Sequence, residues 1–181
     1  MKNILMFASI LFLVVFSTGC SSISKAQVNE KTQPKEEQPE TAKNDDSADE
    51  SAVTNLVEEF GKKLQMVSLQ APKDVLEKSM RENYGDYVSQ QLISKWISDP
   101  LNAPGRLTSS PWPDRIEIQN IRKTSEDTYE VKGSIIEITS EEKTEGGAAL
   151  KRPVTIIVKK LDNRFLIDDV SLGAYDKSDS E

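Results

Sequence analysis

The chain has 181 residues, of which 36% are hydrophobic and 29% are charged, and its net charge of −7 corresponds to a pI near 4.9. These values fit one globular domain with polar extensions, and they exclude a protein that crosses a membrane many times. A single cysteine excludes a fold held by disulfides. Because the sequence has no histidine, Ser-His-Asp and Cys-His nucleophiles and most zinc sites are excluded as well.

An apolar segment stands at the N-terminus. Lys2 is the one charged residue among the first 19, and only Ser9 interrupts the apolar run at residues 4–16. A helix of about thirteen residues reaches about 20 Å, which is shorter than the ~30 Å hydrocarbon core of a bilayer. The pattern therefore predicts a signal peptide over residues 1–19.

Lys2, the apolar run and Thr18-Gly19-Cys20 resemble the lipobox of bacterial lipoproteins, although Ser17 stands where that family usually has leucine. The resemblance implies that the Cys20 thiol receives a diacylglyceryl group and that cleavage makes Cys20 the first residue of the mature chain. Two acyl chains hold a protein on a membrane for long periods. The alternative is a plain secretory signal followed by an incidental cysteine.

Residues 20–50 are expected to form a lipidated, disordered tether. Residues 21–50 contain eight acidic residues, four lysines and two prolines, with Ile23 and Val28 as the only large aliphatic side chains. Such a segment buries too little apolar surface to offset the entropy of ordering it. The folded domain is therefore expected to begin at residue 51.

Three helices are predicted between residues 47 and 100. Residues 47–50, Ser-Ala-Asp-Glu, fit a capping box at the start of the first helix. Pro72 suits the first turn of the second helix and Gly85 its end, while Asp86 suits the start of the third and Pro100 its end. Apolar residues recur at helical spacing in each: Val53, Leu56, Val57, Phe60, Leu64 and Val67; Val75, Leu76, Met80 and Tyr84; Val88, Leu92, Ile93, Trp96 and Ile97.

After Pro113 the apolar period changes to two, which predicts half-buried strands. A change of parity near Gly133 indicates a bulge or a sharp bend, and residues 162–163, Asp-Asn, indicate a tight turn. Residues 141–147 are expected to form a long flexible hairpin tip. The strands are marked by Ile116, Ile118 and Ile121; by Tyr129, Val131, Ile135, Ile136 and Ile138; by Val154, Ile156 and Val158; and by Phe165 and Ile167. Helices followed by strands favour an α+β fold, with three N-terminal helices packed on a bent four-stranded antiparallel sheet.

That element order and the closing phrase at residues 163–170, Asn-Arg-Phe-Leu-Ile-Asp-Asp-Val, are similar to the cone-shaped domains of the nuclear-transport-factor-2-like (NTF2-like) superfamily. The resemblance covers residues 51–173 and implies a bent sheet wrapped against helices, often with a pocket between them. The superfamily includes both enzymes and non-catalytic binding modules, so the resemblance does not decide the function. A generic helical layer on a four-stranded sheet is the alternative. Residues 174–181 are expected to form a disordered tail.

The connection at residues 99–114 is unusual because it holds four prolines in sixteen residues. We expect an ordered loop, in which Trp112 either packs as an anchor or contacts a partner. In the alternative interpretation, Trp112 closes the open end of the sheet and Arg115 pairs with a carboxylate such as Glu117. The candidate partner-binding residues are Arg106, Ser109, Ser110, Trp112 and Arg115.

Three functions stay open, in this order. The first is a non-catalytic interaction module of the cell envelope, bound to the membrane through the lipid on Cys20 and contacting another envelope protein. The second is a carrier or sensor of a small apolar ligand in the cone pocket. The third is a hydrolase or isomerase that works without histidine. No catalytic residue, metal site or cofactor is expected. Residues 51–181 carry 18 basic and 22 acidic side chains, which argues against nucleic-acid binding.

Overall fold

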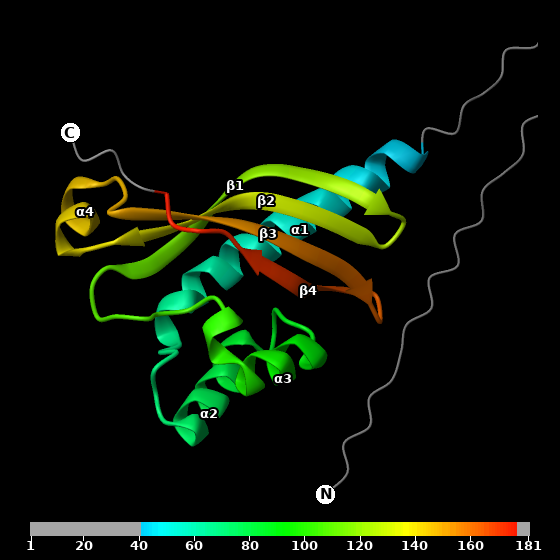
Figure 1. Cartoon of the computed structure of the whole chain (residues 1–181). Helices are drawn as coiled ribbons and strands as arrows, with labels where there is room; N and C mark the ends of the chain where they lie inside the picture. Colours follow the sequence, from blue (N-terminus) through cyan, green and yellow to red (C-terminus); the bar gives the residue numbers. More distant parts are fainter. Residues whose placement is uncertain (1–40, 177–181) are drawn as a thin grey trace, which may run out of the picture. The chain divides into compact units, whose positions relative to one another are not determined.

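The computed structural model describes residues 41–176, with side chains from Asp46 onward. This range forms an α+β fold with four helices and one four-stranded antiparallel sheet, which confirms the predicted class (Figure 1). The predicted signal peptide, Cys20 and the first part of the tether lie outside the described residues. The elements are α1 (Thr41–Lys63), α2 (Lys73–Tyr84), α3 (Gln90–Ser98), β1 (Trp112–Ser125), β2 (Thr128–Ile138), α4 (Ser140–Glu145), β3 (Leu150–Leu161) and β4 (Arg164–Leu172), with short 3-10 turns at Leu64–Met66 and Pro100–Asn102.

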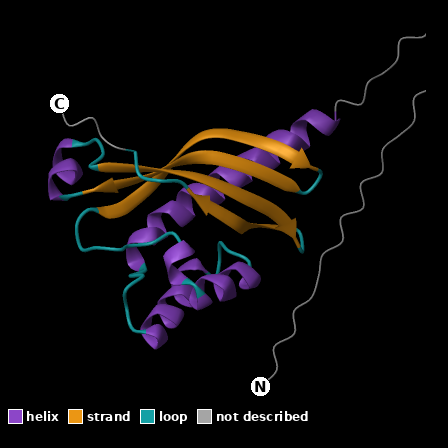
Figure 2. Cartoon of the chain, in the orientation of Figure 1, coloured by secondary structure: helices purple, strands orange, loops and turns teal. Residues whose placement is uncertain are grey.

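The sheet is a simple meander in which β1, β2, β3 and β4 lie side by side in chain order (Figure 2). The turn between β3 and β4 is tight, as predicted, because Asp162 and Asn163 both adopt positive φ angles, of 50° and 61°. Asn and Asp tolerate this conformation better than most residues do. The predicted irregularity near Gly133 is also present, but the extra residue is Gln119 of β1, opposite Gly133. A Cβ atom on Gly133 would lie 2.4 Å from the Glu117 carbonyl oxygen, so the close approach of the two strands requires glycine.

Helix α1 lies against one face of the sheet and crosses its strands, while α2 and α3 lie together near β4 (Figure 1). The space between these helices and the sheet is filled by aromatic rings. Phe60, Tyr84 and Trp96 are buried with ring centroids 5.1 to 6.4 Å apart. The Tyr84 hydroxyl donates a hydrogen bond to the Pro104 carbonyl at 2.9 Å, which satisfies the polar atom in this interior. Within residues 41–176, no helix is both long and apolar enough to cross a membrane.

Two predicted helix starts are wrong. Helix α1 begins at Thr41, so residues 41–50 are helical rather than tether, and Ser47 is an interior position whose carbonyl accepts a hydrogen bond from the Ser51 hydroxyl. Helix α3 begins after Ser89, whose hydroxyl accepts from the Leu92 amide, and not after Asp86. The residues between Asp86 and Ser89 instead pair with β4 through backbone hydrogen bonds.

Three further expectations need correction. The expected flexible tip contains α4, which is capped by a reciprocal hydrogen-bonded box between Thr139 and Glu142. Val75, expected to face inward, is 51% exposed. The expected tail begins with an ordered residue, since the Tyr175 hydroxyl donates to Glu137 at 2.7 Å.

Candidate functional site

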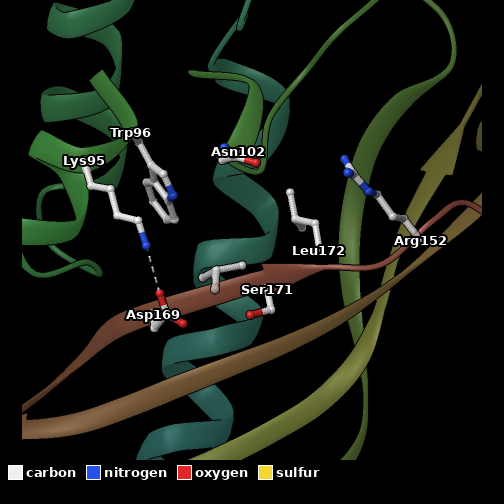
Figure 3. Close-up of a pocket in the computed structure, with 8 residues that line it drawn as sticks. Lys95, Trp96, Asn102, Arg152, Asp169, Ser171 and Leu172 are labelled. Atoms are coloured by element: carbon white, nitrogen blue, oxygen red, sulfur yellow. Dashed lines mark hydrogen bonds and ion pairs between the residues drawn. The ribbon is translucent and has the colours of Figure 1, made fainter. Parts of the chain in front are cut away.

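A cleft of about 360 Å³ opens between α3, the 3-10 turn at Pro100–Asn102 and the edge strand β4 (Figure 3). Its walls combine side chains that are far apart in the sequence: α3 contributes two of them, β3 contributes an arginine, and β4 contributes four consecutive residues. The lining residues are Lys95, Trp96, Asn102, Arg152, Asp169, Val170, Ser171 and Leu172.

One ion pair crosses the cleft from α3 to β4. The Lys95 ammonium lies 3.5 Å from a carboxylate oxygen of Asp169, and the Lys95 side chain is 66% exposed and that of Asp169 48%. The preceding Asp168 points elsewhere and pairs with Lys159 at 2.6 Å, and the hydrogen bond from Lys159 lowers the pKa of Asp168. Asp168 is the extra residue of a bulge in β4 and is engaged by Lys159, so of these two carboxylates only Asp169 lines the cleft.

Arg152 is oriented by neutral groups rather than by a carboxylate. Its Nε donates to the Gly173 carbonyl at 2.9 Å, and its guanidinium lies 5.0 Å from the centroid of the Tyr175 ring. Burial and the hydrogen bond to Glu137 raise the pKa of Tyr175 to about 12. No ion pair among the described residues includes Arg152, so its positive charge is available to a ligand in the cleft.

Trp96 forms the inner wall of the cleft and is only 1% exposed. Its indole N–H takes part in none of the hydrogen bonds between residues that the structure describes, and Figure 3 shows the ring between Lys95 and Leu172. Among the described residues, only the Tyr129 hydroxyl is a fully enclosed polar side-chain atom without a partner, so the indole nitrogen keeps some contact with solvent. It can donate to an acceptor that enters the cleft. With Lys95 and Arg152 nearby, the cleft can bind a carboxylate or a carbonyl oxygen.

The five candidate residues predicted in and after the proline-rich loop do not line this cleft. Arg106 and Ser109 lie together at a separate depression of about 260 Å³, and Ser110 is exposed. Trp112 is half-buried at the start of β1, opposite Ile138.

The alternative interpretation of Arg115 is confirmed. Its guanidinium pairs with Glu117 at 2.6 Å and with Asp114 at 3.0 Å, and these hydrogen bonds raise the pKa of Arg115. The side chain is therefore already engaged by two carboxylates of its own strand. Among the described side chains, no three His, Cys, Asp or Glu residues gather in a metal-binding arrangement.

No protein-family model matches the sequence, and no curated protein matches it. Similar solved structures include an Ntf2-like protein involved in plasmid conjugation, with 15% identity and a TM-score of 0.36 over 88% of this chain and 50% of that chain. They also include a DUF4783 family protein from Bacteroides ovatus, with 12% identity and a TM-score of 0.33 over 68% of this chain and 92% of that chain. A protein of unknown function from Bacteroides thetaiotaomicron has 16% identity and a TM-score of 0.36 over 72% of this chain and 98% of that chain. The chain spans half the length of the first of these proteins, and similarities of this size carry no argument about activity, ligand or partner.

Proposed function

We propose that this chain is a lipid-anchored, extracytoplasmic lipoprotein whose folded part is a non-catalytic binding module of the cell envelope. The anchor is the diacylglyceryl group on Cys20, and the module is an NTF2-like cone of three helices on a bent four-stranded sheet. The lipobox-like residues 17–20 support the anchor, because a lone cysteine directly after an apolar signal core is poorly explained by packing.

The observation that carries the binding role is the cleft between α3 and β4, which is lined by Trp96, Lys95 and Arg152. Arg152 takes part in no ion pair among the described residues, so its charge supports the binding of an acceptor there. We place the partner contact in this cleft. Its chemistry suits a carboxylate or backbone carbonyl presented by another envelope protein. The contact role of Arg106, Ser109, Ser110 and Trp112 stays a prediction.

The filled interior argues against the apolar carrier. A carrier of an apolar ligand needs an enclosed, mostly apolar cavity between helices and sheet, whereas the cleft beside α3 is open and lined largely by polar side chains. In this chain, Phe60, Tyr84 and Trp96 pack against one another between helices and sheet and are buried. An apolar ligand would have to displace these rings, whereas a polar group can enter the cleft beside them.

The anchor is tested by mass spectrometry of the protein purified from membranes. The mature chain is expected to begin at Cys20 and to carry the mass of a diacylglyceryl group. Cys20→Ala is expected to leave the protein unprocessed or to move it to the medium. An unacylated N-terminus, or one at another residue, would contradict the anchor.

The cleft is tested by photo-crosslinking in intact cells from a probe placed at Ser171. We expect a discrete adduct that disappears when Lys95→Glu and Arg152→Glu are added. The matched control is Lys78→Glu with Arg81→Glu, which makes the same charge change on the exposed face of α2. If both pairs of changes have the same effect, the cleft is not the contact.

A further inference from the structure

The first turns of α1 contact the domain without burying any side chain. Between Asp46 and Ala52 every residue is exposed except the half-buried Asp49, and the first fully buried residue is Val53. This stretch, Asp-Ser-Ala-Asp-Glu-Ser-Ala, is rich in residues that favour helices weakly, and a short helix of this kind is marginal in water. Contacts other than apolar burial must therefore keep it helical.

Two lysines of the sheet supply these contacts. The Lys123 ammonium lies 2.5 Å from a carboxylate oxygen of Asp46, and the Lys160 ammonium lies 3.2 and 3.4 Å from the two carboxylate oxygens of Asp49. Asp46 and Asp49 are three residues apart and so share one face of the helix. Figure 1 shows the start of α1 at the end of the sheet where β1 and β3 finish.

Each of these lysines also lies against an aromatic ring. The Lys123 ammonium is 5.8 Å from the centroid of the Tyr129 ring, and the Lys160 ammonium is 5.2 Å from that of Phe165. The two rings pack edge to face at 5.7 Å. Such contacts orient a cation and reduce its hydration. Each strand thus contributes one residue, and the rings from β2 and β4 hold the lysine ammonium groups from β1 and β3 in place.

The same place holds a hydrogen-bond donor that no described residue uses. The Tyr129 hydroxyl is buried without a partner, and the residue is 2% exposed. Burial raises the pKa of Tyr129 by more than the nearby Lys123 ammonium lowers it, and the negative charges of Asp49 and Asp46 also raise it, so the hydroxyl keeps its proton. Two cations and one free donor form a site with more capacity for carboxylate oxygens than Asp46 and Asp49 fill.

We infer that Lys123, Lys160 and the Tyr129 hydroxyl form a binding site for an acidic helical segment with two carboxylates three residues apart. Residues 46–49 of this chain occupy the site as a releasable intramolecular ligand. Partly exposed ion pairs are weakened by salt, and the interior begins only at Val53, so the segment can leave while the rest of the domain stays folded. An acidic segment of another protein can then take its place. This inference depends neither on the lipid anchor nor on the cleft beside Trp96.

Hydrogen exchange of the full chain tests the intramolecular contact. In Lys123→Gln with Lys160→Gln, we expect amides of residues 47–52 to exchange at least about tenfold faster, while amides of residues 57–64 keep their rates. The matched control is Lys132→Gln with Lys159→Gln, which removes two lysines of the same sheet that pair with Glu130 and Asp168. Equal exchange of residues 47–52 in the wild type and in the first variant would overturn the inference.

A labelled peptide with the sequence of residues 43–54 tests the site in trans. We expect it to bind the full chain carrying Asp46→Asn and Asp49→Asn, in which the site is vacated, and to bind the self-occupied wild type at least about tenfold more weakly. Adding Lys123→Gln and Lys160→Gln should abolish binding, as should asparagine in place of both aspartates in the peptide. Binding to all of these proteins alike, or to none of them, would overturn the inference.

Discussion

The two halves of α1 are held to the sheet by different interactions. From Val53 onward the inward side chains, such as Val57 and Phe60, are fully buried, and each contributes about 1.5–3 kcal/mol through the hydrophobic effect. Before Val53 the helix is held by two partly exposed ion pairs, which contribute far less than a buried apolar side chain and are screened by salt. The part of α1 from Val53 onward should therefore unfold only with the whole domain. The part before Val53 belongs to the same helix, but its attachment to the sheet should weaken as the salt concentration rises.

Phe60→Ala should have the largest effect, because it removes the ring at the centre of the aromatic cluster in the apolar half of α1. We expect a loss of about 3–5 kcal/mol in the free energy of unfolding, measured by denaturant titration. Met66→Ala, at an exposed position, is the control and should change it by less than about 0.5 kcal/mol. A similar small value for Phe60→Ala would contradict the packing described for this half.

Gly61→Ala should destabilise the fold by about 1–3 kcal/mol, even though alanine favours helices. A Cβ atom at this position would lie 2.7 Å from the backbone nitrogen of Ile116, so helix and strand would have to move apart. Ser51→Ala in the polar half has no such neighbour and should be neutral or slightly stabilising. If thermal unfolding shows both alanines to be stabilising, the two halves do not differ in packing.

Tyr175→Phe tests a third kind of contact, which combines partial burial, as in the apolar half of α1, with a charged partner, as in the polar half. Its effect on stability should depend on pH in the alkaline range. The Tyr175 pKa of about 12 in the folded state lies above the ordinary value of about 10, so the contribution of the hydroxyl is complete below about pH 10 and is lost as the pH rises through about 12. The variant should lose about 1 kcal/mol at neutral pH and should show a shallower decline in stability between about pH 10 and 12. Parallel pH profiles for variant and wild type would contradict this assignment.

Lys160→Gln should have the smallest effect, at most about 1 kcal/mol, because its partner Asp49 belongs to the polar half. The difference from the wild type should disappear in about 1 M salt, where charges are screened over a few ångströms. Unfolding measured at low and high salt checks both statements. A loss that persists at high salt would show that Lys160 acts through packing of its stem on Phe165.

The elements set by local patterns could be predicted from the sequence. Val53, Val57 and Phe60 follow the helical period and are buried in α1, and residues 162–163 form the tight turn, so both are found where expected. The predicted first helix extended too far, because α1 ends at Lys63 and Val67, although buried, has an extended backbone. The start of α4 also has a local signal, Thr139 followed three residues later by Glu142, but the acidic composition of that stretch favoured a flexible tip.

Features that depend on distant residues could not be predicted in the same way. Helix α1 starts early because Asp46 and Asp49 meet lysines that are 77 and 111 residues away in the chain. The cleft joins Lys95 and Trp96 to Asp169, and only the packing of α3 beside β4 brings them together. The four prolines of residues 99–114 indicated a candidate contact loop, whereas the cleft residues are scattered along the sequence and have no local compositional signal.

The order of the contacts along α1 also has a mechanical consequence. If the membrane anchor is at Cys20, a pull on the chain reaches Asp46 and Lys123 first, then Asp49 and Lys160, and only afterwards the buried Val53. Unwinding the twelve residues from Thr41 to Ala52 would lengthen this segment from about 18 Å as a helix to about 40 Å as an extended chain. The pulling force would reach the hydrophobic core only after this segment had been fully extended.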